Sequence, residues 1–341
     1  MKAVLTRRKA AMSCGIAAAV VLAGLGGAAG LVHAQQSGTG QNLTVQRLRP
    51  NFYMISGAGG NIGVQTGSDG VVVVDTGTKD TSAQVLAEIR KMSDQPIRYI
   101  VNTSVDADNV GGNETISKAG VNIFSGASGA RGEFMKAMTG GGASIMAHEN
   151  VLTRMSAPTG KAPAFPSAFW PTEAFPQNRK YIYLNHEGIE VLHQPAAHSD
   201  GDSVVFFRAS DIVMAGNIID TNRFPVIDVE KGGSVQGEID ALNRLIELAI
   251  PPIPYIFQEG GTYVIPGHGR VYDQADVVEY RDMIVIVRDV IEDMLSRGMT
   301  LDQIEAANPV LPYEKQFGAK AGPWTTGNFI EAVYRSLAGK K

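Results

Sequence analysis

Short apolar runs, interrupted by glycine-containing turns, dominate the chain after residue 50. NFYMISG (51–57), NIGVQTG (61–67) and GVVVVDTG (70–77) have the pattern of antiparallel strands. Thr81 and Gln84 have the spacing of a capping box, which predicts a helix over 81–93. The run IRYIV then predicts a buried strand, followed by a polar loop and a short helix near 112–119.

A similar pattern returns in the second half of the chain. Three stretches predict another antiparallel set: RKYIYLNHEGIEVLHQP, DSVVFFRAS and DIVMAGNII. A helix over 234–249 and the strand TYVIPGHG follow. Two sets of strands with intervening helices predict an α/β protein with two sheets packed face to face and helices outside.

Two further regions have distinct patterns. Residues 273–297 place apolar side chains on one helical stripe, which predicts a packing face: Val277, Tyr280, Ile284, Val287, Ile291 and Met294. Residues 138–175 contain a glycine run and several prolines, which predicts an irregular loop.

The first 34 residues have the features of an export signal. A basic start leads into an Ala/Gly/Val/Leu stretch that ends in Val32-His33-Ala34. We therefore expect cleavage after Ala34 and a periplasmic or secreted protein without a stable membrane anchor. The pair Arg7-Arg8 is compatible with the twin-arginine route as well as with general secretion.

Composition narrows the possible chemistry. The single cysteine, Cys14, lies inside the predicted signal, so the mature chain is expected to lack disulfides and cysteine metal ligands. The net charge of −4 becomes more negative once the basic signal is removed, which argues against a nucleic-acid partner. A small-molecule substrate is the expected partner.

Polar side chains gather where predicted strands end. Asp75 follows VVVV, NTSVDADNVGGN (102–113) follows IRYIV, His198 and Asp202 lie in AAHSDGD, and His268 lies in IPGHG. Loops at one edge of a two-sheet protein can converge, so these segments are candidates for one site. A cluster of helix N-cap residues is the simpler alternative for the 104–109 loop.

These motifs resemble the metallo-β-lactamase superfamily in order and rough spacing. The resemblance rests on GGNIGVQTGSDGVVVVDTG, NTSVDADNVGGN, PAAHSDGDSVVFF, IVMAGNIID, FPVIDVEKGG and VIPGHGRV. It implies a four-layer αβ/βα sandwich over residues 35–272, with 273–341 as a helical extension packed on the same domain. It also implies a metal site at one edge of the sheets.

The superfamily signature His-x-His-x-Asp-His is degenerate in this sequence. The resemblance places Ser104, Asp106 and Asn109 at the three histidine positions, and Asn217 at the position of the bridging aspartate. Three ligand positions are retained, namely Asp108, His198 and His268, and Gly111-Gly112 also matches. Asp75 falls where the superfamily keeps a supporting carboxylate.

Ligand chemistry then limits the metal content. Neutral amide and hydroxyl oxygens are poor zinc ligands, and two cations without a bridging carboxylate repel each other. Asp106, Asp108, His198 and His268 are the candidate ligands, and Ser104, Asn109 and Asn217 are weaker ones. We expect at most one divalent transition metal per chain (Zn, Fe or Mn), or none.

Three functions remain open at this point. The first is a hydrolase of an ester, lactone, thioester or amide with an altered metal site and Asp108 as the catalytic residue. The second is a non-catalytic periplasmic binding or scaffold protein. The third is a metal-free hydrolase that uses Asp106 and Asp108 as acid and base. The other histidines are expected to be structural or exposed: His148, His186 and His193.

Overall fold

A computed structural model describes residues 42–123, 141–160, 162–252 and 260–339. The predicted export signal lies outside these residues. Within the described part, no helix has the length and the apolar character that a membrane span requires.

The first sheet contains seven strands in the order β1-β2-β3-β4-β5-β6-β9. The first four are antiparallel neighbours: β1 (Thr44–Arg49), β2 (Phe52–Ser56), β3 (Ile62–Gly67) and β4 (Gly70–Val74). The other three continue in parallel: β5 (Ile97–Val101), β6 (Ser144–His148) and β9 (Glu173–Phe175). The predicted antiparallel strands 51–77 are therefore confirmed.

The second sheet contains five strands in the order β10-β11-β12-β13-β14. These are β10 (Arg179–Leu184), β11 (Glu187–Gln194), β12 (Asp202–Phe207), β13 (Ile212–Asp220) and β14 (Tyr263–His268). Neighbours are antiparallel except β13 and β14, which run parallel. The parallel pair leaves the carboxyl ends of both strands at one edge of the sheet.

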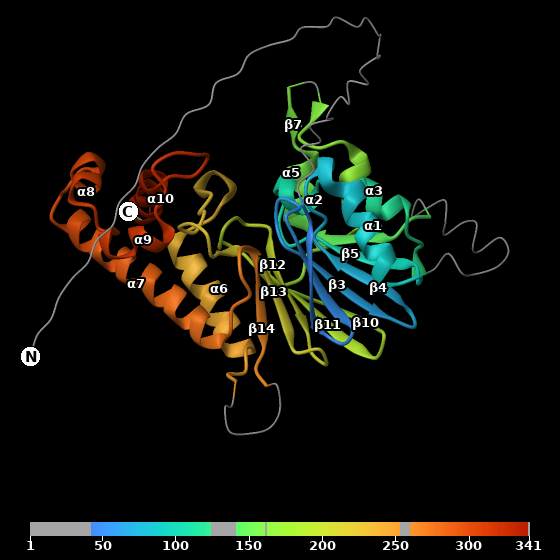
Figure 1. Cartoon of the computed structure of the whole chain (residues 1–341). Coiled ribbons are helices and arrows are strands. Elements are labelled where there is room, and N and C mark those ends of the chain that lie inside the picture. The colour runs from blue at the N-terminus through green and yellow to red at the C-terminus, as the bar shows by residue number, and fades with distance from the viewer. Residues whose placement is uncertain (1–41, 124–140, 161, 253–259, 340–341) are drawn as a thin grey trace, which may run out of the picture. The chain divides into compact units, whose positions relative to one another are not determined.

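Helices cover the outer faces of both sheets (Figure 1). Next to the first sheet lie α1 (Ser82–Met92), α2 (Ala107–Val110) and α3 (Asn113–Lys118), and next to the second lie α6 (Val235–Leu248) and α7 (Gln274–Ser296). Further helices are α5 (Glu149–Ser156), α8 (Leu301–Ala307), α9 (Glu314–Phe317) and α10 (Thr326–Ala338). The order helix, sheet, sheet, helix is the predicted four-layer αβ/βα sandwich.

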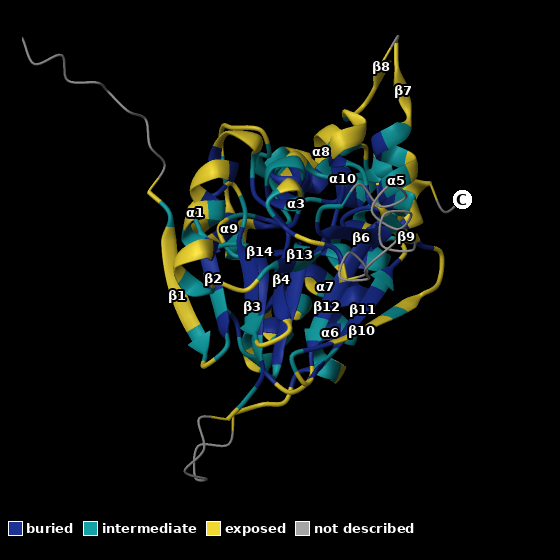
Figure 2. Ribbon diagram, turned by 90° about the vertical axis from the view of Figure 1, so that its right-hand side faces the viewer, coloured by how far each residue is buried: buried dark blue, intermediate teal, exposed yellow. Residues whose placement is uncertain are grey.

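The valine run of β4 shows why this layering forms. Val72 and Val74 contribute to the core between the sheets, whereas Val71 and Val73 pack with α1. Both faces of the strand are buried, so the strand needs an unbroken apolar run. Phe52 and Phe207 join the two sheets edge to face, with ring centroids 4.8 Å apart. Figure 2 shows this buried interior as a continuous dark region.

The C-terminal helices share one core with the second sheet. The predicted stripe of α7 packs there: Val277, Tyr280, Ile284, Val287 and Ile291 are buried, and Met294 is partly buried. Residues from α10 and from β13 belong to the same cluster, including Phe329, Val213 and Ala215. Burial of this stripe holds the helical extension against α6, which in turn packs on β13.

Two local expectations were wrong. Residues 144–156 are not an irregular loop, because β6 is fully buried between β5 and β9 and α5 follows it directly. The helix near 81 does form, but Thr81 makes no side-chain cap. Its hydroxyl instead donates to the Ala58 and Thr78 carbonyl oxygens, which ties the helix start to the loop after β2.

Candidate functional site

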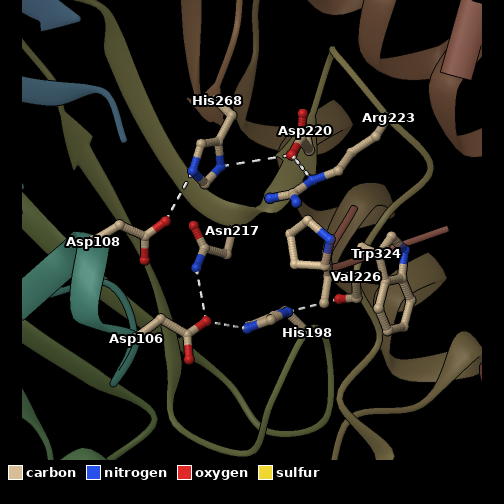
Figure 3. A pocket seen from close by; sticks show the side chains of 10 residues that line it. Asp106, Asp108, His198, Asn217, Asp220, Arg223, Val226, His268 and Trp324 are labelled. Atoms are coloured by element: carbon tan, nitrogen blue, oxygen red, sulfur yellow. Dashed lines mark hydrogen bonds and ion pairs between the residues drawn. The ribbon is translucent and has the colours of Figure 1, made fainter. Parts of the chain in front are cut away.

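The candidate site lies where four strands end at one edge of the sandwich. Asp75 follows β4, the polar loop 102–109 follows β5, Asn217 lies near the end of β13, and His268 ends β14. His198 lies in the loop between β11 and β12. The structure therefore brings together the segments that the sequence singled out. Figure 3 shows Asp106, Asp108, His198, Asn217 and His268 around one cavity.

Asp75 fixes the position of the polar loop 102–109 through hydrogen bonds. Its carboxylate accepts hydrogen bonds from the Thr103 amide (2.8 Å), the Thr103 hydroxyl (2.6 Å) and the Asn109 side-chain amide (2.9 Å). Burial raises the pKa of Asp75 to about 7, although these bonds favour the charged form. Asp75 thus positions the loop and does not face the cavity as a ligand.

The retained glycine pair allows the loop to pack closely. A Cβ on Gly111 would lie 2.5 Å from the Ala107 carbonyl oxygen and from the Lys79 amide nitrogen. A Cβ on Gly112 would lie 2.4 Å from the Thr76 carbonyl oxygen. Any side chain at either position would push α2 away from the loop after β4, and with it the two aspartates.

Asp106 is fully engaged by groups of the chain itself. One carboxylate oxygen accepts from Lys231 Nζ at 2.8 Å, and the other accepts from His198 Nε2 at 2.6 Å and Asn217 Nδ2 at 3.0 Å. Lys231 also lies 2.9 Å from the carboxylate of Asp228. Asp106 stands at the N-cap position of α2 without making a cap bond, so the N-cap alternative does not explain its side chain.

These contacts fix the charges around Asp106. Burial alone would raise its pKa, but the hydrogen bond and charge of His198, together with Lys231, hold the pKa well below its usual value. Burial alone would lower the pKa of His198, yet Asp106 and Asp202 raise it to about 10. The second nitrogen of His198 donates to the Val226 carbonyl oxygen at 2.6 Å. Both nitrogens of this imidazolium therefore have acceptors.

Asp108 forms a second, separate pair with His268. His268 Nε2 lies 2.8 Å from Asp108 Oδ2, and its Nδ1 lies 3.7 Å from Asp220 Oδ2. Burial lowers the pKa of His268, but its two carboxylate neighbours raise it above the usual value overall. Arg223 donates to the same Asp220 oxygen at 2.6 Å, and this bond fixes the position of the Asp220 carboxylate.

The weaker candidates bond to one another. Asn217 Nδ2 contacts Asn109 Oδ1 at 3.0 Å and Ser104 Oγ at 3.4 Å, and the Ser104 hydroxyl donates to Asn109 Oδ1 at 3.2 Å. The Ser104 hydroxyl, the Asn109 oxygen and the Asn217 nitrogen therefore form a local network that closes the loop onto β13, whereas the buried Asn217 Oδ1 has no hydrogen-bond partner in the described structure. Figure 3 shows the Asn217 nitrogen toward Asp106 and its oxygen on the side of Asp108 and His268.

One cavity of about 170 Å³ is lined by all four candidate ligands. Its wall also includes residues that sequence reasoning missed, namely Asp220, Arg223, Val226, Pro323 and Trp324. Asp220 and Arg223 could have been found from their place at the end of a predicted strand. Trp324 belongs to the C-terminal extension, for which only a packing role was expected.

The donor set does not fit a metal centre of the superfamily type. In the part of the chain that the structure describes, no three His, Cys, Asp or Glu side chains are grouped so that they could hold a metal ion. The Lys231 ammonium occupies one oxygen of Asp106, and a second cation beside it would be repelled. Asp108 and His268 supply two ligands, fewer than a tight zinc site needs. As metal ligands, the four residues remain a prediction.

Comparisons with known proteins support the fold. The model of the metallo-beta-lactamase superfamily matches residues 56–255, and the chain belongs to that superfamily. No curated protein matches the chain.

Solved structures share the architecture at low sequence identity. A stereoselective inverting sec-alkylsulfatase, Pisa1 from Pseudomonas sp., gives a TM-score of 0.60 at 15% identity over 87% of this chain and 50% of that chain. A double mutant of the same enzyme gives 0.61 at 14% identity with the same coverage. A metallo-beta-lactamase from Pontibacter korlensis gives 0.49 at 16% identity, covering 72% of this chain and 99% of its own. The chain thus spans about half the length of the sulfatase, and at these identities the likeness shows the fold alone.

Proposed function

We propose that this protein is an exported hydrolase of the metallo-β-lactamase superfamily that cleaves a carboxylic ester or a related lactone, thioester or amide. The observation that carries the proposal is the Asp108–His268 pair, which faces a cavity and is backed by Asp220. We further propose that the site holds at most one transition metal per chain and that its hydrolytic chemistry does not depend on that metal.

Asp108 is the proposed general base. Its carboxylate would accept a proton from a water molecule as that water attacks the substrate carbonyl carbon. The tetrahedral intermediate would then collapse as the protonated Asp108 returns this proton to the leaving oxygen, sulfur or nitrogen. The bond to the leaving group breaks, the acid product forms, and Asp108 regains its starting state.

The cationic groups of the cavity have a supporting role in this scheme. His268 holds Asp108 in place through a hydrogen bond of 2.8 Å, and Asp220 keeps the imidazolium oriented. Arg223 lines the same cavity, so its charge and that of His268 would stabilise the negative charge that develops on the carbonyl oxygen.

The geometry argues against Asp106 as a partner of Asp108 in acid–base catalysis. Asp106 is paired with Lys231 and His198, and its pKa is well below the usual range, so it has no proton to give. Its proposed role is structural: it joins the polar loop to the loop that carries His198 and to the segment that carries Lys231.

A non-catalytic binding protein is the second candidate. Its specific support is the same saturated network around Asp106, because a site whose charges are all paired can be conserved for folding alone. The two functions differ in whether the wild type turns over any substrate.

A kinetic comparison of two variants tests the proposal. Asp108→Asn keeps the shape of the side chain but removes the base, whereas His186→Gln changes an exposed histidine in the turn between β10 and β11. The substrates are p-nitrophenyl esters, lactones, thioesters, β-lactams and, because of the structural neighbour, a secondary alkyl sulfate. Turnover that is lost in Asp108→Asn and kept in His186→Gln supports the hydrolase. No turnover by the wild type on the whole panel supports the binding protein.

A further inference from the structure

A second cavity of about 390 Å³ adjoins the candidate active site. Its floor is formed by Val105 and Ala107 from the polar loop and the start of α2. Its walls come from the end of α5 and from the segment that follows it, with Ala157, Ala164 and Phe165 as the apolar lining. This segment includes the short hairpin of β7 (Pro158–Thr159) and β8 (Ala162–Pro163), which is exposed in Figure 2.

The charged side chains at this second cavity already have partners. Arg154 donates to both carboxylate oxygens of Asp200, at 2.6 and 2.7 Å. Lys231 lies between Asp106 and Asp228, at 2.8 and 2.9 Å. An anionic ligand would have to compete with these carboxylates for either cation. Thr159 also lines this cavity, and its hydroxyl donates to the Ala162 carbonyl oxygen at 3.3 Å. The rest of the surface left for a ligand is apolar.

Asp106 lies between the two cavities, because it lines both of them. One carboxylate oxygen faces His198 and Asn217 in the first cavity, and the other faces Lys231 in the second. A molecule whose reactive carbonyl lies beside Asp108 would reach the apolar space by extending past the Asp106 side chain.

We infer that the second cavity binds an uncharged apolar arm, acyl or alkyl, of the substrate that is cleaved beside Asp108. This inference rests on the proposed function and deepens it: the substrate class becomes esters with an extended apolar arm. Ala157, Ala164 and Phe165 determine specificity in this account, and they do not touch the reacting atoms.

The test compares two tryptophan substitutions in neighbouring positions. Ala164→Trp would fill the second cavity, whereas Ala162→Trp adds the same side chain to β8 outside the cavity lining. With p-nitrophenyl hexanoate and p-nitrophenyl acetate, the wild type should favour the hexanoate by at least about 10-fold in kcat/KM. Ala164→Trp should remove that preference and leave the acetate rate within about twofold, and Ala162→Trp should behave as the wild type. An equal effect of Ala164→Trp on both esters, or on neither, would overturn the inference.

A binding measurement separates this inference from the proposed function. Ligand-observed NMR with hexanamide and acetamide requires no turnover. If the wild type turns over no member of the whole substrate panel, the proposed function fails. The apolar subsite is still supported when hexanamide binds, acetamide does not, and Ala164→Trp abolishes the binding. Unchanged hexanamide binding in Ala164→Trp would contradict the subsite even in an active enzyme. Phe165→Ala, which removes one wall, should also weaken hexanamide binding.

Discussion

Lys231 Nζ lies 2.8 Å from Asp106 Oδ1, and this ion pair joins the polar loop after β5 to the segment before α6. By the resemblance to the superfamily signature, Asp106 stands at a position expected to hold a metal-ligating histidine. In this chain an aspartate stands there instead, and the positive charge beside it comes from a lysine and from the His198 imidazolium. The chain's own cations thus balance the carboxylates of the site.

Replacement of Lys231 tests the structural value of this pair. Lys231→Met leaves Asp106 with His198 and Asn217 alone, so the free energy of unfolding should fall by about 1 kcal/mol, allowing for solvent screening of the part-exposed ammonium. Lys91→Met is the control, because Lys91 forms an exposed pair with Glu88 one helical turn away. Chemical denaturation measures both variants. Equal stability of Lys231→Met and wild type would show that the pair has no structural role.

The stacked imidazoles of His148 and His193 predict a loss of stability in acid. Their rings lie 3.4 Å apart and nearly parallel, and His148 Nδ1 accepts the Asn150 amide at the start of α5. Burial, and then the neighbouring His193, lower the pKa of His148 to about 4. The unfolded chain therefore binds the proton first, and stability is lost as the pH falls from 6.5 to 4.

The size of this effect is up to about 3 kcal/mol, the free energy that corresponds to the shift in pKa. Unfolding by denaturant at pH 7 and pH 4.5 measures it. His148→Phe should make the difference between the two pH values smaller, and His186→Gln should leave it as in the wild type, because His186 is exposed. A difference between the two pH values that is the same in His148→Phe as in the wild type is incompatible with a buried neutral His148.

The contribution of Glu238 to stability should depend on pH in the opposite direction to that of His148. Its side chain is fully buried in α6, neither of its carboxylate oxygens has a hydrogen-bond partner in the described structure, and burial raises its pKa well above the usual value. The folded state therefore keeps a proton that the unfolded chain releases above about pH 4.3. The contribution of Glu238 is favourable at low pH and is lost as the pH rises through the folded pKa.

Two substitutions separate the charge of Glu238 from its polarity. Glu238→Gln should remove this part of the pH dependence, and Glu238→Met should raise the free energy of unfolding at pH 8 by ~1–3 kcal/mol, because no polar group is then left unpaired. Gln274→Met is a useful contrast, since the Gln274 amide donates to two carbonyl oxygens and its loss should destabilise. Destabilisation by Glu238→Met would mean that the carboxyl group has a stabilising partner.

The substitution His268→Gln tests whether the positive charge of His268 assists Asp108 in catalysis. The amide can still donate to Asp108, but the cation between Asp108 and Asp220 is lost. We expect kcat to fall about 10-fold or more with little change in KM, because the charge acts on the transition state. Asp108→Asn should cost on the order of 100-fold or more in kcat. If His268→Gln raised KM alone, His268 would act in substrate binding and not in the chemistry.

Much of the sandwich could be predicted because its strands are short apolar runs bounded by glycine-containing turns. The valine run of β4 and the apolar stretches of β10–β12 identified their strands directly. The strand β6 and helix α5 were missed, because SIMAHENVLTRMS follows a glycine run and precedes several prolines, and this composition concealed a buried strand.

The candidate site could be predicted only in part. Strand ends identified Asp75, Asp106, Asp108, His198 and His268, because each follows or ends an apolar run. The Lys231–Asp106 pair joins residues 125 positions apart, and nothing in the local sequence predicts such a pairing. Trp324 reaches the cavity from a loop before α10, and only the packing of the C-terminal helices places it there.

The most direct test of the central claim is ester hydrolysis by one preparation of the wild type before and after exhaustive dialysis against a chelator, with the metal content measured in both samples. If the charges of the site come from the chain itself and Asp108 is the general base, the protein should contain at most one metal per chain before dialysis. Its kcat/KM should be unchanged after dialysis. Loss of activity on dialysis, with recovery on addition of zinc, iron or manganese, would contradict the account.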